Sequence, residues 1–198
     1  MKVLISEFIS LDGVVQAPGG VDEDPSGGFR HGGWSYPYFD PDVMGSALFE
    51  LLRQSDAMLQ GRRTYEGMAA AWPERTDDDD PFATLMNSQQ KYVVSDTLSE
   101  NDLSWKPATL IRKADLHAKL AELREQPGGY LSVTGSASVA RALLEADLVD
   151  ELALAIEPIV LGGGKTIYPN NGEAQRFDLI SVVTTKTGVQ FCRYQRAR

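Results

Sequence analysis

Short apolar runs alternate with helix-spaced apolar stripes along most of the chain. Runs rich in β-branched residues predict strands, whereas apolar positions that recur every three or four residues predict helices. The predicted strands cover residues 2–9, 56–60, 91–95, 109–111, 130–134, 150–157, 178–186 and 189–195. The predicted helices cover residues 40–52, 64–69, 116–124 and 135–145. This order indicates an α/β fold with a mixed, mostly parallel sheet flanked by helices and a C-terminal antiparallel pair, joined as a hairpin at Thr187-Gly188.

Two segments depart from this alternation, although no repeat or linker divides the chain and residues 1–198 are expected to form a single domain. Residues 16–37 hold six glycines and three prolines without periodicity, which is typical of a lid or binding loop. A plain mobile insertion is the alternative. If the segment is a lid, its aromatic end closes over the ligand and its acidic stretch, residues 22–24, stays in solvent. Residues 77–80, four consecutive aspartates, predict a solvated acidic loop, with a cation site as the less favoured alternative.

Charge and cysteine content exclude several classes of partner. The chain has 19 Lys and Arg against 28 Asp and Glu, a net charge of −9, which disfavours nucleic acid and anionic membranes. No apolar run reaches the roughly 18 residues of a membrane span, and the first residues read as a strand rather than a signal peptide. The single Cys192 excludes an internal disulfide, and His31 and His117 lack ligand-like neighbours, so no metal is expected. We expect a cytoplasmic protein that binds a small molecule.

Two strand-to-helix turns are candidate anion sites. Each places free backbone N–H groups and the positive end of a helix where a phosphate could bind. The first turn is Gly61, Arg62, Arg63 and Thr64, and it adds two guanidinium groups and a hydroxyl to the backbone N–H groups. The second turn offers small residues that admit a ligand to the backbone, in Gly135, Ser136, Ala137 and Ser138. Two such turns in one sheet suit a dinucleotide pyrophosphate. The alternatives are a glycine turn with solvated arginines in the first case and a serine helix cap in the second.

Other nucleotide and hydrolase motifs are missing or incomplete. There is no G-x-G-x-x-G fingerprint, and no G-x-S-x-G elbow that would anchor a hydrolase triad. The run Gly162-Gly163-Gly164-Lys165-Thr166 is not a P-loop, because Ile159 stands where the first glycine is required and no helix is predicted after it. Cys192 lies within a predicted strand and is expected to fill the core.

Asp12 is the candidate catalytic residue. It follows the first predicted strand and precedes Gly13. A carboxylate at this place can orient an amino or amide group or relay a proton. An aspartate that caps a turn is the equally weighted alternative.

Taken together, these motifs resemble the dihydrofolate reductase-like superfamily. The closer similarity is to the branch that contains the C-terminal reductase domain of bifunctional riboflavin-biosynthesis proteins and its stand-alone bacterial relatives. The similarity rests on the order of residues 9–13, 61–66, 91–95, 134–138 and 148–162, which together span most of the chain. The resemblance implies a three-layer α/β/α fold that binds NADPH in an extended pose.

The resemblance also implies roles for individual residues. Arg62, Arg63 and Thr64 would meet the 2′-phosphate and pyrophosphate side, and Ser95 would lie near the adenosine. Residues 135–138 would cradle the pyrophosphate, while Asp12 and the segment around Trp34 would face the nicotinamide and the substrate. The chain departs from dihydrofolate reductases in lacking a clear acid on the helix after the long loop, which argues against folate as substrate. It also lacks the zinc motif of the riboflavin deaminase.

The sequence therefore predicts an NADPH-dependent reductase that delivers hydride to a C=N or C=O bond of a small polar heterocycle or carbonyl compound. A nucleotide-binding sensor or interaction module without turnover is the alternative. A homodimer is expected, because residues 189–194 carry apolar and aromatic side chains on what the order of elements predicts to be an outer strand.

Overall fold

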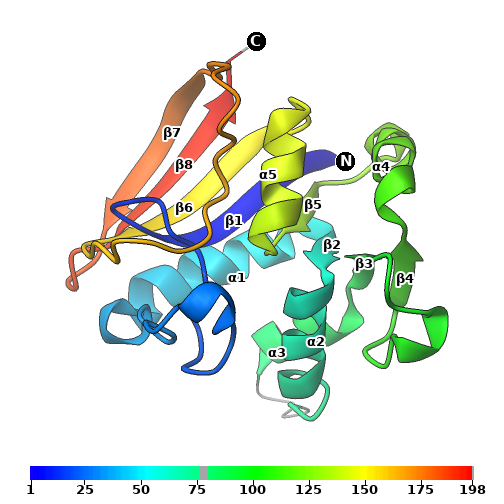
Figure 1. Ribbon diagram of the computed structural model, residues 1–198, viewed down its shortest axis with the longest axis horizontal. Helices are drawn as coiled ribbons and strands as arrows, with labels where there is room; N and C mark the ends of the chain where they lie inside the picture. Colours follow the sequence, from blue (N-terminus) through cyan, green and yellow to red (C-terminus); the bar gives the residue numbers. More distant parts are fainter. Residues whose placement is uncertain (76–79, 198) are drawn as a thin grey trace.

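The computed structural model describes residues 1–75 and 80–197, and its eight strands form one sheet in the order β4-β3-β2-β5-β1-β6-β8-β7 (Figure 1). The first six strands in this order are parallel, and β8 is antiparallel to both β6 and β7. The strands are β1 (Lys2–Ser10), β2 (Ser55–Gly61), β3 (Gln90–Val94), β4 (Ala108–Ile111), β5 (Tyr130–Val133), β6 (Glu151–Glu157), β7 (Phe177–Thr184) and β8 (Gln190–Arg196). The predicted fold class is confirmed.

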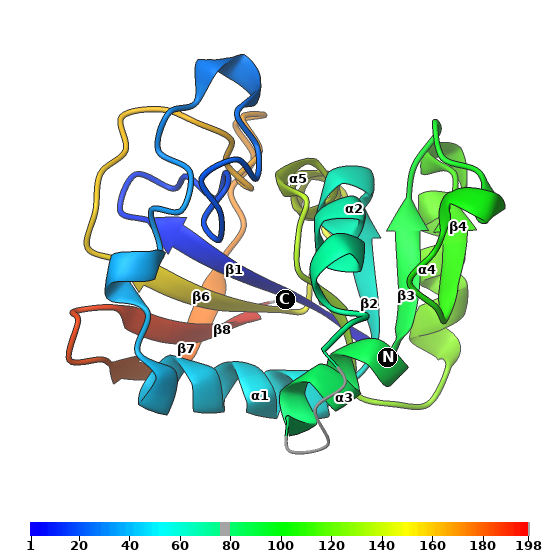
Figure 2. The same cartoon turned by 90° about the horizontal axis from the view of Figure 1, so that it is seen from below.

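Helices cover both faces of the sheet (Figure 2). They are α1 (Ser46–Arg53), α2 (Arg62–Ala71), α3 (Pro81–Ser88), α4 (Leu116–Glu125) and α5 (Ala137–Glu145). The largest core cluster joins α4 and α5 to one face of the sheet, for example through Leu120 and Leu143. On the other face, α1 packs against β1, β6 and β8, while α2 and α3 pack against β2 and β3. In the described residues, no helix is both long and apolar enough to cross a membrane.

Helix α3 was not predicted from the sequence. It is eight residues long and is capped by Asp80, whose carboxylate accepts hydrogen bonds from the backbone N–H groups of Phe82 and Ala83 at 3.0 Å. An aspartate just before Pro81 is therefore a helix cap, although the acidic run had favoured a loop. The rest of the expected acidic loop, residues 77–79, lies outside the described residues.

The outer strand is β7, and the prediction that residues 189–194 form it is wrong. The hairpin folds back so that β8 lies between β6 and β7. On this outer strand four large apolar side chains, Leu179, Ile180, Val182 and Val183, are left 48–55% exposed. Cys192 on β8 is buried, as expected for a core residue.

The sheet divides at β1. This strand pairs with β5 only from Lys2 to Ile5, whereas it pairs with β6 from Leu4 to Ser10. Beyond this fork, β1 and β6 turn away from β2 and β3 (Figure 2). Ligands of open α/β sheets bind where neighbouring strands diverge at their carboxyl ends, so the fork indicates where to look for a site.

One buried lysine makes stability depend on pH. Lys91 on β3 is 0% exposed, its Nζ donates to the carbonyl of Asn87 at 2.7 Å, and it lies 4.2 Å from the centre of the Trp105 ring. Burial lowers the pKa of Lys91 to about 8.

We predict that Lys91→Met abolishes a rise in stability at alkaline pH. In the wild type, the unfolded chain holds the Lys91 proton more tightly than the folded chain from about pH 8 to the ordinary lysine value. The contribution of Lys91 to the free energy of unfolding therefore increases as pH is raised through this window. Urea unfolding across the window measures it. Lys113→Met, at a side chain 72% exposed, is the control and should keep the increase. Parallel curves for wild type and Lys91→Met would contradict the prediction.

Candidate active site

The two predicted anion turns lie against each other at the carboxyl ends of β2 and β5. The N–H of Gly61 donates to the carbonyl of Gly135 at 3.3 Å. A Cβ on Gly61 would overlap Oγ of Ser136, and a Cβ on Gly135 would lie 2.7 Å from Oγ1 of Thr64. Both positions therefore need glycine, and Gly135 also has φ +107°, which disfavours other residues.

Among the described residues, neither helix that starts at these turns has a side-chain cap at its N-terminus. Gly61 precedes α2 and has no side chain to cap it, and the Ser136 hydroxyl does not bond to the first turn of α5. That hydroxyl pairs instead with Oγ of Ser138 at 3.0 Å. Ser136 thus stands at the N-cap position of α5, as the serine-cap alternative predicted, but its side chain does not make the capping hydrogen bond. Free N–H groups at two adjoining helix ends fit the oxygens of a pyrophosphate.

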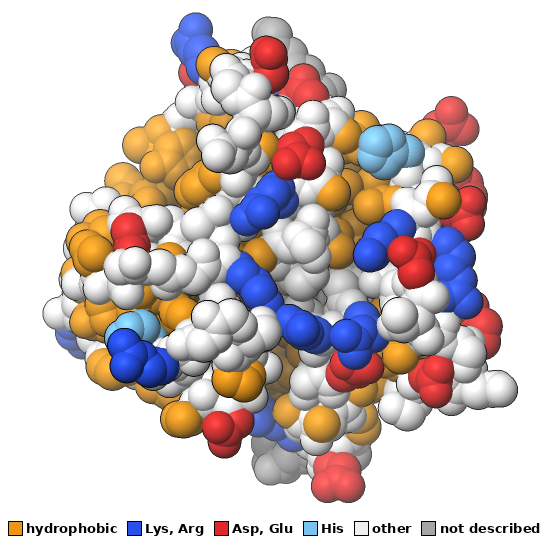
Figure 3. Space-filling view, viewed as in Figure 1, with side chains coloured by type: hydrophobic (Ala, Val, Ile, Leu, Met, Phe, Trp, Pro, Cys, Tyr) orange, Lys and Arg blue, Asp and Glu red, His pale blue; other side chains and the backbone are white. Residues whose placement is uncertain are grey.

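Positive side chains line the same face. Figure 3 shows a row of Lys and Arg side chains across its middle. Arg62 pairs with Glu66 at 3.2 Å on the surface of α2. Arg63 instead reaches across to the long loop, where its Nη1 donates to Asp24 at 3.2 Å and to Ser26 at 3.1 Å. Both guanidinium groups are roughly half exposed, so a phosphate can compete for them.

Asp22 and Glu23 are exposed, as expected for the acidic stretch, but Asp24 is not, which corrects the expectation for this one residue. Its side chain is 17% exposed and pairs with Lys165 as well as with Arg63. Burial opposes its ionisation, but the Lys165 ammonium and the Ser26 hydroxyl hold the pKa of Asp24 below its ordinary value. Asp24 lies between two cations because the glycine-rich loop brings it to both Arg63 and Lys165. For the Asp24 carboxylate, the attraction to Arg63 and Lys165 is stronger than the hydration that it would have in solvent.

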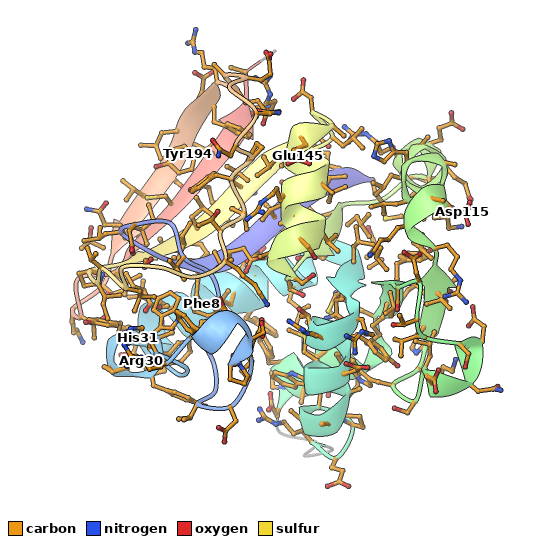
Figure 4. The ribbon with its side chains drawn as sticks, in the orientation of Figure 1. Phe8, Arg30, His31, Asp115, Glu145 and Tyr194 are labelled. Atoms are coloured by element: carbon orange, nitrogen blue, oxygen red, sulfur yellow. The ribbon has the colours of Figure 1, made fainter. Side chains whose placement is uncertain are left out.

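A pocket of about 520 Å³ lies between this loop and the glycine run after β6. Arg30 and His31 line it from the long loop, which follows the strand that carries Phe8 (Figure 4). The opposite wall is the backbone of residues 161–165. No helix follows this run, which agrees with its rejection as a P-loop. Sequence reasoning missed its role as a pocket wall, although three consecutive glycines were a signal for close backbone approach.

Asp12 joins the end of β1 to this glycine run. Its carboxylate accepts hydrogen bonds from Oγ of Ser10 at 2.6 Å and from the N–H groups of Leu161 and Gly162 at 3.1 and 2.8 Å. These bonds, chiefly the one from Ser10, hold the pKa of Asp12 below its ordinary value. The contacts favour the turn-residue alternative, and proton handling by Asp12 stays a prediction.

Ser95 and Trp34 are both engaged within the protein. Oγ of Ser95 accepts from the N–H groups of Thr97 and Leu98 at the end of β3. Trp34 is 6% exposed, and its Nε1 donates to the carbonyl of Gln16 at 2.8 Å. The Trp34 bond joins the two ends of the long loop, residues 16–37, to each other. The predicted adenosine and substrate contacts of Ser95 and Trp34 stay predictions.

Two acids with a buried carboxyl oxygen were missed by sequence reasoning. Glu157 ends β6 and accepts a 2.5 Å hydrogen bond from Ser35, and burial raises its pKa to about 7 although this bond opposes the shift. Glu7 lies within β1, and burial, with the nearby charge of Glu23, raises its pKa to about 8. Glu7 could have been found from the sequence, because it lies between Ile5 and Ile9 at a strand position where the alternation predicts an apolar side chain. Within the described residues, no group of three acids, histidines or cysteines is arranged to hold a metal.

We predict that Asp24→Asn loosens the long loop. The change removes the carboxylate shared by Arg63 and Lys165, and one charge-assisted hydrogen bond contributes about 1.5–3 kcal/mol. Amide exchange in residues 16–31 should speed up by about tenfold or more. Asp22→Asn is the matched control, because within the described residues Asp22 forms no ion pair. Equal exchange in the two variants would show that Asp24 does not hold the loop.

Comparisons with known proteins agree with this geometry. Residues 1–191 match the family described as RibD C-terminal domain. YyaP of Bacillus subtilis (strain 168) is 26% identical over 190 residues, covering 95% of this chain and 91% of YyaP. A putative riboflavin biosynthesis protein from Shewanella sp. PV-4 has a TM-score of 0.75 at 22% identity, with both chains covered in full. Dihydrofolate reductase from Enterococcus faecalis has a TM-score of 0.59 at 14% identity, covering 100% of this chain and 97% of that one. The chain belongs to the RibD C-terminal domain family, as its motifs had indicated.

Proposed function

We propose that the protein is an NADPH-dependent reductase that acts on a C=N or C=O bond of a small polar heterocycle or carbonyl compound. Its family and fold support a reductase of this superfamily. The observation that carries the proposal is the contact between two uncapped helix ends beside Arg62 and Arg63. This arrangement fits a pyrophosphate and an additional phosphate better than it fits an uncharged ligand.

The chain's own residues would bind and orient the cofactor. Arg62, Arg63 and Thr64 are assigned to the 2′-phosphate and pyrophosphate, residues 135–138 to the pyrophosphate, and Ser95 to the adenosine end. When bound, NADPH supplies the hydride. Asp12 positions the glycine run that walls the pocket, and the long loop with Trp34 excludes water from the reacting end. We also propose that the protein is cytoplasmic and that its substrate is a small molecule.

Titration with NADPH, followed by a screen of heterocycles and carbonyl compounds, tests the proposal. We expect NADPH fluorescence to change on binding, and absorbance at the reduced-nicotinamide band to fall with a substrate. Binding without turnover across the screen would favour the sensor alternative. Absence of binding to NADPH would overturn the cofactor assignment.

We predict that the double substitution Arg62→Ala and Arg63→Ala weakens NADPH far more than NADH. A charged contact to the 2′-phosphate contributes about 1.5–3 kcal/mol, or roughly 10–150-fold in affinity. The ratio of the two dissociation constants is the measurement. Arg53→Ala is the control, because Arg53 forms a similar surface pair with Glu50 on α1. An equal loss for both cofactors would show that these arginines do not bind the 2′-phosphate.

We also propose a homodimer, now through β7 instead of residues 189–194. No helix lies over β7 and β8 on the face seen in Figure 1, and Leu179 and Val182 of β7 are about half exposed. An apolar edge strand is normally covered or paired, because an open one promotes aggregation. Light scattering should give twice the 21.7 kDa chain mass, and Val182→Lys should give one chain mass. A single chain mass for the wild type at all concentrations would contradict the dimer.

A further inference from the structure

Glu7 occupies the strand that forms the fork. It lies two residues beyond Ile5, the last residue of β1 that pairs with β5, and it is opposite Leu154 of β6. Side chains alternate along a strand, so Glu7 shares its face with Val3, Ile5 and Ile9. Those residues pack in the cluster that includes α5, so Glu7 lies on the α5 face, at the end where that helix begins.

The carboxyl group of Glu7 has no hydrogen-bond partner among the described residues. Its Oε1 is buried and unpaired, although the side chain as a whole is only half-buried. An unpaired buried polar atom is a net cost to folding, and a ligand that completes its hydrogen bonding is one of the explanations for such an atom. Glu7 is therefore a candidate ligand contact.

Few charged groups act on this carboxyl. Glu23 of the long loop lies close enough to disfavour its ionisation. Lys165 pairs with Asp24 instead, and Arg141 of α5 donates to Thr166. The strands on either side present Leu154 and Val133. Burial and Glu23 thus keep Glu7 protonated at neutral pH, with a pKa of about 8.

The proposed cofactor site directs one end of the dinucleotide to Glu7. The sheet order runs from β3 through β2 and β5 to β1. With the adenosine near Ser95 after β3 and the pyrophosphate at residues 135–138 after β5, an extended dinucleotide continues to β1. Its nicotinamide end then reaches the fork, on which Glu7 lies.

We propose that Glu7 contacts the nicotinamide end of the cofactor, protonated beside the neutral reduced ring and ionised beside the cationic oxidised ring. The inference rests on the proposed cofactor function. An opposite charge within a few ångströms favours the ionised form of a carboxyl. Binding of NADP⁺ therefore releases the Glu7 proton to solvent, whereas NADPH binds without this release. Glu7 makes the relative affinity for the two redox states depend on pH.

Calorimetric titration with NADP⁺ and with NADPH, in buffers of different ionisation enthalpy, tests this inference without any substrate. Below about pH 8, the affinity for NADP⁺ relative to NADPH should rise with pH, by up to about tenfold per pH unit. At about pH 7, NADP⁺ should release up to about one more proton than NADPH. The 2′-phosphate is common to both ligands, so its titration cancels in the ratio.

Three variants locate the effect. Glu7→Gln should make the ratio independent of pH and remove the extra proton release. Glu157→Gln removes the buried acid on the opposite face of the sheet and should leave the slope unchanged. Glu23→Gln should move the rise to lower pH while keeping its slope, because one source of the raised pKa is gone.

The outcomes separate the inference from the function on which it rests. A wild-type ratio that does not change with pH, or a slope that persists in Glu7→Gln, overturns the role of Glu7 and leaves the reductase proposal intact. Failure of the folded wild type to bind either nucleotide overturns both. Melting curves of Glu7→Gln without ligand confirm that the variant is folded.

Discussion

The close approach of Gly61 to the Gly135–Ser136 turn is the constraint on which the site depends. It brings two helix N-termini together at the carboxyl ends of β2 and β5, where neither helix is capped by a side chain of the described residues. One helix end attracts an anion weakly, whereas two adjoining ends and nearby guanidinium groups make a concentrated positive region. Side chains larger than hydrogen at either glycine would separate the turns.

An acidic protein can hold such a region because charge acts locally. The net charge of −9 is spread over the surface, while the positive row lies across one face (Figure 3). Screening in salt limits the reach of exposed charges to about 8–10 Å. Asp24 is the exception that matters, because it lies within the row and neutralises part of it. An anionic ligand must therefore compete with the protein's own carboxylate, and this competition couples ligand binding to the long loop.

The buried acids Glu7 and Glu157 lie on opposite faces near the fork. Each has a carboxyl oxygen without a partner, and burial favours the protonated form of both. Glu157 is held by Ser35 of the long loop, whereas Glu7 has no such bond. Glu157 therefore connects the long loop to the sheet, whereas Glu7 is free for the ligand contact that we propose.

The sequence by itself determined most of the order of elements, the parallel sheet with its antiparallel end and both strand-to-helix turns, because hydrophobic period and glycine placement are local properties. Helix α3 escaped because its eight residues follow an acidic run that favours a loop. Only the tertiary structure decided that β8 is internal and that Asp24 pairs with Arg63 and Lys165. It also decided that Asp12 accepts a hydrogen bond from the glycine run, 150 residues away along the chain. It also showed Glu7 unpaired at the fork. Hydrogen-bond partners and strand neighbours of this kind depend on how distant segments pack, and no local pattern encodes them.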